Sequence, residues 1–115
     1  MKYNGSCHCG AVAFEAEGEI GEVMSCNCSI CRRKGFLLWP LPREKLRLVT
    51  KPEAMATYTF NKHVIQHRFC ATCGIHPFAE ATAPSGQPMA AVNARCLEGI
   101  DISALQVQHF DGRSR

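Results

Sequence analysis

Long apolar stretches are missing from this chain of 115 residues. No run approaches the roughly 18 apolar residues that a membrane-spanning helix needs. Residues 1–6 contain no apolar segment of the kind found in signal peptides. Blocks of lysine and arginine, which mark nucleic-acid-binding tails, are also missing. These absences predict a cytoplasmic protein that binds neither membranes nor nucleic acids.

Internal repeats, linkers and low-complexity segments are missing as well, and the length fits a single domain spanning residues 1–115. A chain this short buries only about two-thirds of the surface that its unfolded form exposes. Additional cross-links should therefore help to stabilise it. The eight cysteines are the candidates. Since disulfides rarely persist in a reducing cytosol, closely spaced cysteines there indicate zinc binding.

Apolar and polar residues alternate with period two in several segments, which is typical of strands. Eight strands are predicted, at residues 11–16, 36–41, 46–50, 56–60, 63–69, 77–82, 89–94 and 105–110. Helix is expected only as short turns at 29–34 and 42–45. The first of these would be capped by Ser29 and stopped by Gly35.

Seven of the cysteines fall into three short groups, Cys7-x-Cys9, Cys26-x-Cys28-x-x-Cys31 and Cys70-x-x-Cys73. Such gaps let thiolates from one tight turn converge on a zinc ion, each about 2.3 Å from the metal. Gly10 and Gly74 follow two of the groups, where a positive φ would close the turn. Cys96 stands alone and is expected to be a small buried hydrophobic residue.

Ligand number assigns the sites, because a structural zinc has four protein ligands and a reactive zinc has three plus an open position. The two pairs sum to four, so Cys7, Cys9, Cys70 and Cys73 are predicted to share a structural zinc. Cys26, Cys28 and Cys31 then form a catalytic zinc site, whose metal should be lost more easily. Spacing also permits the triplet to share a metal with either pair. A further alternative is a second structural zinc completed by His, Asp or Cys96.

Charge bears on the partners of the protein. The formal net charge is +3, but seven thiolates holding two Zn²⁺ would bring it to zero, which again argues against a nucleic-acid partner. Arg32 and Arg33 directly follow the triplet and are candidates for binding an anionic ligand, with a solvated charged turn as the equal alternative. Four of the five histidines are expected to be half-buried polar residues rather than acids or bases: His63, His67, His76 and His109. His8 lies between two predicted ligands, and its side chain should point away from the metal.

The three cysteine groups and their surroundings resemble one known family. The similarity lies in Gly5-Ser6-Cys7-His8-Cys9-Gly10, Cys26-Asn27-Cys28-Ser29-Ile30-Cys31-Arg32, Arg68-Phe69-Cys70-Ala71-Thr72-Cys73-Gly74 and Val92-Asn93-Ala94-Arg95. The chain looks like a glutathione-dependent formaldehyde-activating enzyme, from about Gly5 to Asp111. This resemblance implies an all-β fold of curved antiparallel sheets around a four-cysteine zinc site, shared with small zinc proteins that regulate Rab GTPases.

The resemblance also implies an activity and its site. By position, it assigns Cys7, Cys9, Cys70 and Cys73 to the structural zinc, and Cys26, Cys28 and Cys31 to the catalytic one. The family's reaction, of the carbon–sulfur lyase class, joins glutathione to formaldehyde to give S-hydroxymethylglutathione. Arg32, Arg33 or Arg68 would pair with the carboxylates of glutathione, and Phe36 and Trp39 would wall the pocket. The alternatives are an enzyme for a different thiol adduct and a non-catalytic zinc-stabilised binding module.

Overall fold

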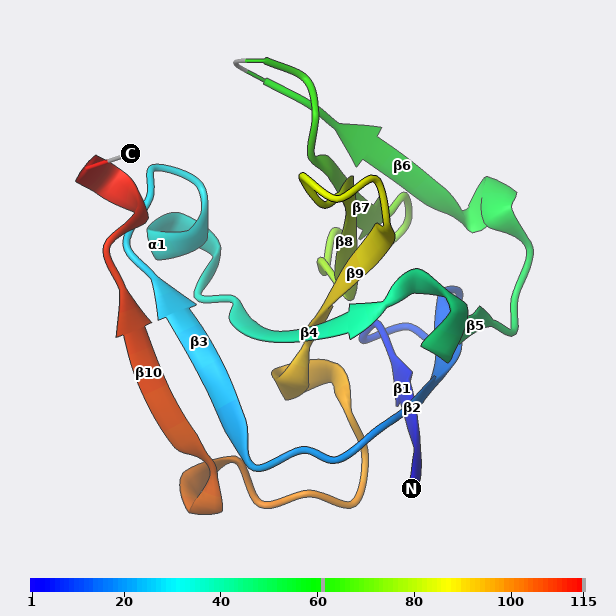
Figure 1. Ribbon diagram of the computed structural model, residues 1–115. Helices are drawn as coiled ribbons and strands as arrows, with labels where there is room; N and C mark the ends of the chain where they lie inside the picture. Colours follow the sequence, from blue (N-terminus) through cyan, green and yellow to red (C-terminus); the bar gives the residue numbers. More distant parts are fainter. Residues whose placement is uncertain (61, 115) are drawn as a thin grey trace.

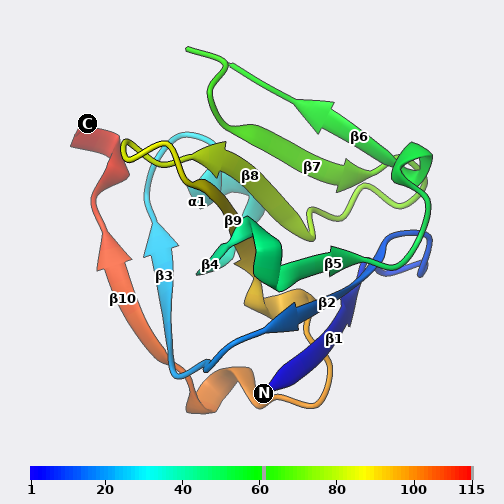
Figure 2. The same ribbon diagram turned by 45° about the vertical axis from the view of Figure 1, so that its right-hand side comes forward.

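In a computed structural model, residues 1–60 and 62–114 are described, and their strands form two sheets (Figures 1 and 2). The three-stranded sheet has the order β1 (Lys2–Ser6), β2 (Ala13–Glu17) and β5 (Leu46–Leu48). The seven-stranded sheet has the order β10 (Gln106–Phe110), β3 (Glu22–Cys26), β4 (Leu37–Pro42), β9 (Pro88–Asn93), β8 (Phe78–Thr82), β7 (Gln66–Cys70) and β6 (Met55–Tyr58). All pairs are antiparallel except β3 and β10, which run parallel.

All eight strands expected from the alternating pattern are present, with ends that differ by a few residues, so the all-β fold is confirmed. Strands β1 and β3 were not expected. The sequence of β1, KYNGS, contains asparagine and glycine, which are depleted in strands and conceal the pattern. Strand β3, EVMSC, has one fully buried residue, Val23, so its alternation is too short to recognise.

Helical structure in the described residues is limited to single turns, none of which is long and apolar enough to cross a membrane. They are α1 (Cys31–Lys34) and the 3-10 turns η1 (Arg43–Lys45), η2 (Pro52–Ala54), η3 (Ala94–Cys96), η4 (Ile102–Ala104) and η5 (Gly112–Ser114). Gly35 ends α1 in the left-handed region, as expected. The predicted Ser29 cap is wrong, because Ile30 precedes the helix and the N–H of Cys31 points at the Sγ of Cys28.

The core lies between the two sheets. Phe14 of the small sheet packs edge-on against Phe78 of the large one, and Tyr3 packs in the same way against Trp39. Trp39 faces the small sheet and lines none of the clefts described below, so its predicted place in a pocket wall is wrong. Alternation along β4 explains this, because Trp39 shares the core face with Leu37 and Leu41, which are also buried.

The opposite face of the large sheet carries a row of paired positions across four strands. His67 of β7 pairs with Ala79 of β8, Ala79 pairs with Ala91 of β9, and Ala91 pairs with Pro40 of β4. Paired positions share one face of a sheet. Two alanines at the centre of this row leave the face hollow, and the candidate site lies there.

Candidate functional site

Four cysteines meet where β1 and β7 end. Cys7 and Cys9 follow β1, Cys70 ends β7 and Cys73 follows it. Their Sγ atoms all lie within 4.8 Å of one another, with 3.7 Å between Cys7 and Cys9 and 3.6 Å between Cys9 and Cys70. A tetrahedral zinc with ligands at about 2.3 Å requires sulfur separations of about 3.8 Å. The four thiols therefore fit a closed zinc site.

Backbone N–H groups point at these sulfur atoms. The backbone N–H groups of Cys73 and Thr72 each donate a hydrogen bond to the Sγ of Cys70, with 3.3 Å between nitrogen and sulfur. These two hydrogen bonds lower the pKa of the Cys70 thiol. The N–H of Ile75 is the main reason that the pKa of Cys73 falls to about 6. Gly74 has the expected positive φ of 82°, which closes the turn. Cys70 and Cys73 thus favour the thiolate, the form that binds metal.

The triplet lies at the end of β3 and the start of α1. The Sγ atoms of Cys26, Cys28 and Cys31 also lie within 4.8 Å of one another. Among the described residues, no His, Asp, Glu or further Cys joins this group. Burial would raise the pKa of Cys28, but the N–H of Cys31 and the neighbouring thiols outweigh it and lower that pKa. Three thiols and no fourth ligand fit a zinc site with one open position.

The triplet forms part of the wall of a cleft of about 330 Å³, here called the inner cleft. Its floor is the hollow face of the large sheet, with Ala79 and Ala91. Phe36 lines it, as expected. A volume of this size lies within the range of small-molecule sites.

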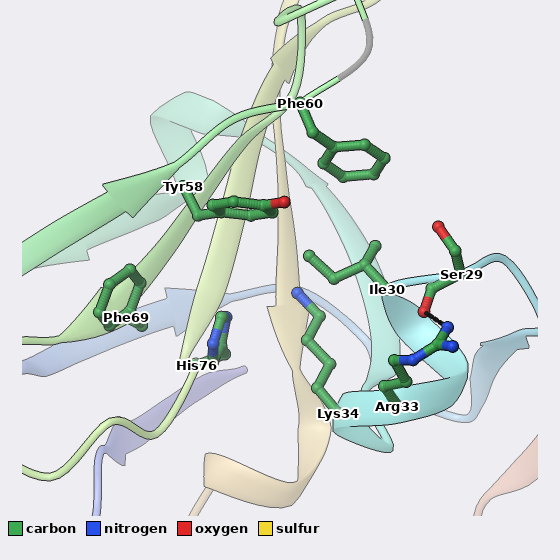
Figure 3. A pocket seen from close by; sticks show the side chains of 8 residues that line it. All are labelled: Ser29, Ile30, Arg33, Lys34, Tyr58, Phe60, Phe69 and His76. Atoms are coloured by element: carbon green, nitrogen blue, oxygen red, sulfur yellow. Dashed lines mark hydrogen bonds between the residues drawn. The ribbon is translucent and has the colours of Figure 1, made fainter.

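A second cleft of about 600 Å³, the outer cleft, adjoins the first. It is lined by Ser29, Ile30, Arg33, Lys34, Tyr58, Phe60, Phe69 and His76 (Figure 3). Ile30, Lys34 and Phe60 line both clefts, so the two adjoin at these residues. Figure 3 shows Lys34 reaching from α1 toward the aromatic side of this cleft. The outer cleft thus combines aromatic walls with two cations.

Lys34 stands where the clefts join, with its Nζ 3.3 Å from Nδ1 of His67. The same Nζ lies 4.3 Å from the centre of the Phe36 ring. Burial is the main cause that lowers the pKa of Lys34, and burial with the nearby Lys34 charge lowers the pKa of His67 to about 4. His67 is therefore neutral at pH 7, and its Nδ1 accepts a hydrogen bond from the Lys34 ammonium.

The sequence and the fold of this chain are similar to those of known proteins. A sequence profile of the glutathione-dependent formaldehyde-activating enzymes matches residues 2–110. The chain belongs to this family. A crystal structure of a Rhodobacter sphaeroides protein from a structural genomics programme superposes with a TM-score of 0.78 and 33% sequence identity, covering 94% of this chain and 100% of that one. The family is named for enzymes that use glutathione and formaldehyde, which is carbon–sulfur lyase chemistry.

The arginines expected to bind glutathione in this family member are placed differently from one another. Arg33 lines the outer cleft and donates a 2.7 Å hydrogen bond to the carbonyl of Ser29. Arg32 instead lines a third cleft of about 440 Å³, together with Arg95. The prediction for Arg68 is wrong, because its guanidinium binds Glu80, Thr57 and Gln66.

Two further predictions concern single residues. Cys96 is half-buried and packs against the core, and burial raises the pKa of its thiol to about 11, so it is a packing residue as expected. His67 was expected to be half-buried and without a part in chemistry, but it is 5% exposed and directly contacts Lys34 beside the triplet. The sequence separates His67 from Lys34 by 33 residues, so only the packing of α1 near β7 reveals the contact.

Proposed function

We propose that this protein is a zinc-dependent carbon–sulfur lyase that adds the thiol of glutathione to formaldehyde and gives S-hydroxymethylglutathione. The observation that carries the proposal is the convergence of three thiols, Cys26, Cys28 and Cys31, on the wall of a cleft that adjoins an aromatic, cationic one. The family match over residues 2–110 supports it independently.

The triplet supplies the place where the thiol reacts. A zinc ion bound there would hold the substrate sulfur as a thiolate at its open coordination position. The hollow sheet face next to the triplet leaves room for the aldehyde at that point. Partial exclusion of water by Phe36 and Phe60 strengthens the electrostatic interactions of the site.

Lys34 acts on the aldehyde oxygen. As the S–C bond forms, the π electrons of the carbonyl move onto oxygen, and the Lys34 ammonium donates a hydrogen bond to the charge that develops there. The oxygen then takes a proton from Nζ, and Lys34 recovers one from solvent, equal to the proton that the thiol lost. The Nδ1 of His67, 3.3 Å away, holds the ammonium in position.

The outer cleft would hold the rest of glutathione. Arg33 offers a cation for one of its carboxylates, and Tyr58 and Phe69 offer flat apolar walls for its backbone. Arg32 lines the third cleft, which also borders Cys26 and Cys31, and its charge there would attract the anionic substrate toward the triplet.

The test must separate catalysis from the spontaneous addition of thiols to formaldehyde. Exchange NMR on equilibrium mixtures of glutathione and formaldehyde measures how fast free and hydroxymethylated thiol interconvert. We expect exchange to accelerate in proportion to the concentration of two-zinc protein, and not with the Cys28→Ser variant. Equal rates with both proteins would contradict catalysis and favour a binding module. Acceleration with other thiols but not with glutathione would point to a different adduct.

A further inference from the structure

The walls of the inner cleft are more apolar than formaldehyde requires. The hydrophobic side chains of these walls include six from three strands and the connecting segments: Met24, Phe36, Leu38, Phe60, Ile65 and Met89. Formaldehyde carries only hydrogen on its carbonyl carbon and would leave most of the 330 Å³ empty. Unfilled apolar space next to a reacting centre is a binding site for an apolar group.

The polar residues that line the inner cleft do not make it a site for charged groups. Glu80 accepts hydrogen bonds from Arg43 and Arg68, so its carboxylate is already neutralised. His67 is neutral, almost fully buried and occupied at Nδ1 by Lys34. Among the described lining residues, Lys34 is the one cation, and it stands at the border with the outer cleft. The Nε2 of His67 has no hydrogen-bond partner, but it is neutral and buried from solvent. A carboxylate deeper in the inner cleft would therefore lack a cationic partner.

The hollow has a definite origin in the sequence. Three alanines, Ala79 and Ala81 on β8 and Ala91 on β9, line the inner cleft on adjacent strands. On the core side of the same strands, the paired residues Phe78 and Val92 are large and buried. Ala79, Ala81 and Ala91 thus stand where larger side chains would fill the cleft.

We propose that the inner cleft is a subsite for an alkyl or aryl substituent on the electrophile, so that the substrates include apolar aldehydes larger than formaldehyde. This inference rests on the proposed function, since it assumes that the thiol carrier occupies the outer cleft. In the reaction, the thiol sulfur bonds to the aldehyde carbon, the carbonyl π pair moves to oxygen, and that oxygen takes the proton lost by the thiol. The product is a hydroxyalkyl thioether whose alkyl chain lies on Ala79 and Ala91.

Stable thioethers test the subsite without turnover. S-methyl-, S-propyl- and S-hexylglutathione share the same carboxylates and differ only in the chain that would enter the inner cleft. Calorimetric titration into zinc-loaded protein should show an affinity gain of about fourfold for each buried methylene. Affinity that stays flat or falls with chain length would overturn the proposal.

A substitution that fills the hollow provides the matched comparison. Ala91→Leu adds bulk to the floor, and the ratio of S-hexyl to S-methyl affinity should fall to about one. Ala104→Leu makes the same change at an exposed site in η4 and should keep the wild-type ratio. A wild-type ratio in a folded Ala91→Leu protein would contradict the assignment of this cleft.

A second measurement needs neither a variant nor glutathione. Straight-chain alcohols titrated into protein with labelled methionine methyls should shift the signals of Met24 and Met89, more for hexanol than for ethanol. No shift at either methyl would overturn the subsite. Formaldehyde exchange measured in parallel keeps the two proposals apart. Catalysed exchange without a chain-length effect removes the subsite alone, whereas a chain-length effect without catalysed exchange removes the proposed function and leaves an apolar binding site.

Discussion

Gly112 lies so close to Cys26 that a Cβ added to it would be 2.5 Å from the cysteine Sγ. The C-terminal turn η5 therefore packs directly on the triplet. Asn27, within the triplet segment, fixes this contact: its amide donates to Asp111 at 3.0 Å, and its side-chain oxygen accepts from the N–H of Arg113 at 2.9 Å. The C-terminal turn thus helps to set the geometry of the three thiols.

Substitution of this glycine should weaken the second metal site. In Gly112→Ala, either Cys26 or the C-terminal turn must move, and we expect zinc affinity at the triplet to fall roughly 10- to 100-fold, as for other groups that orient metal ligands. Competition with a chelator measures this. Gly21→Ala, where an added Cβ meets nothing within 4 Å, should bind zinc like the wild type. Equal affinities in the two variants would show that η5 has no such role.

The two cysteine clusters should respond differently to loss of one ligand. Cys73→Ser removes one of four ligands that join the ends of two distant strands, so it should unfold or precipitate the protein. Cys28→Ser should remain folded, with one zinc per chain and no catalysed exchange. Circular dichroism and metal analysis decide between the outcomes. Collapse of both variants would mean that both metals are structural and would favour a binding module.

Lys34 should matter for rate rather than for metal binding. We expect Lys34→Met to lower kcat roughly 100-fold, the usual effect of removing a donor to a developing oxyanion, while the zinc content stays at two per chain. Lys51→Met, at an exposed position outside both clefts, is the control. Full activity in Lys34→Met would remove Lys34 from the mechanism.

Buried neutral His67 should make stability depend on pH. Its pKa is lowered from the ordinary 6.5 to about 4, so between these values the unfolded chain binds a proton that the folded chain does not. This contribution to the free energy of unfolding is present in full above about pH 6.5 and is lost as the pH falls toward 4. Urea unfolding of His67→Gln should show a weaker decline over that window than the wild type. If the free energy of unfolding of His67→Gln fell with pH as steeply as that of the wild type, His67 would not be the cause. His109→Gln, a change at an exposed position, controls for general effects of acid.

The sequence predicted the local features of this protein better than its long-range contacts. Alternation located most strands, and short cysteine gaps predicted the groups of four and three that the structure brings together. Alternation does not tell which face of β4 is the core, so Trp39 was placed on the wrong side. The Lys34–His67 contact depends on how α1 packs near β7, and the packing of Gly112 on Cys26 depends on a close backbone approach. A single sequence reveals neither.

The central claim is that the triplet holds zinc with an open position that accepts the substrate thiol. X-ray absorption at the zinc edge, measured on the two-zinc protein before and after addition of glutathione, tests it most directly. We predict that the second zinc gains one sulfur ligand beyond Cys26, Cys28 and Cys31, while the first, bound by four cysteines, stays unchanged. An unchanged sulfur count at saturating glutathione, in protein that still accelerates exchange, would contradict activation of the thiol at this site.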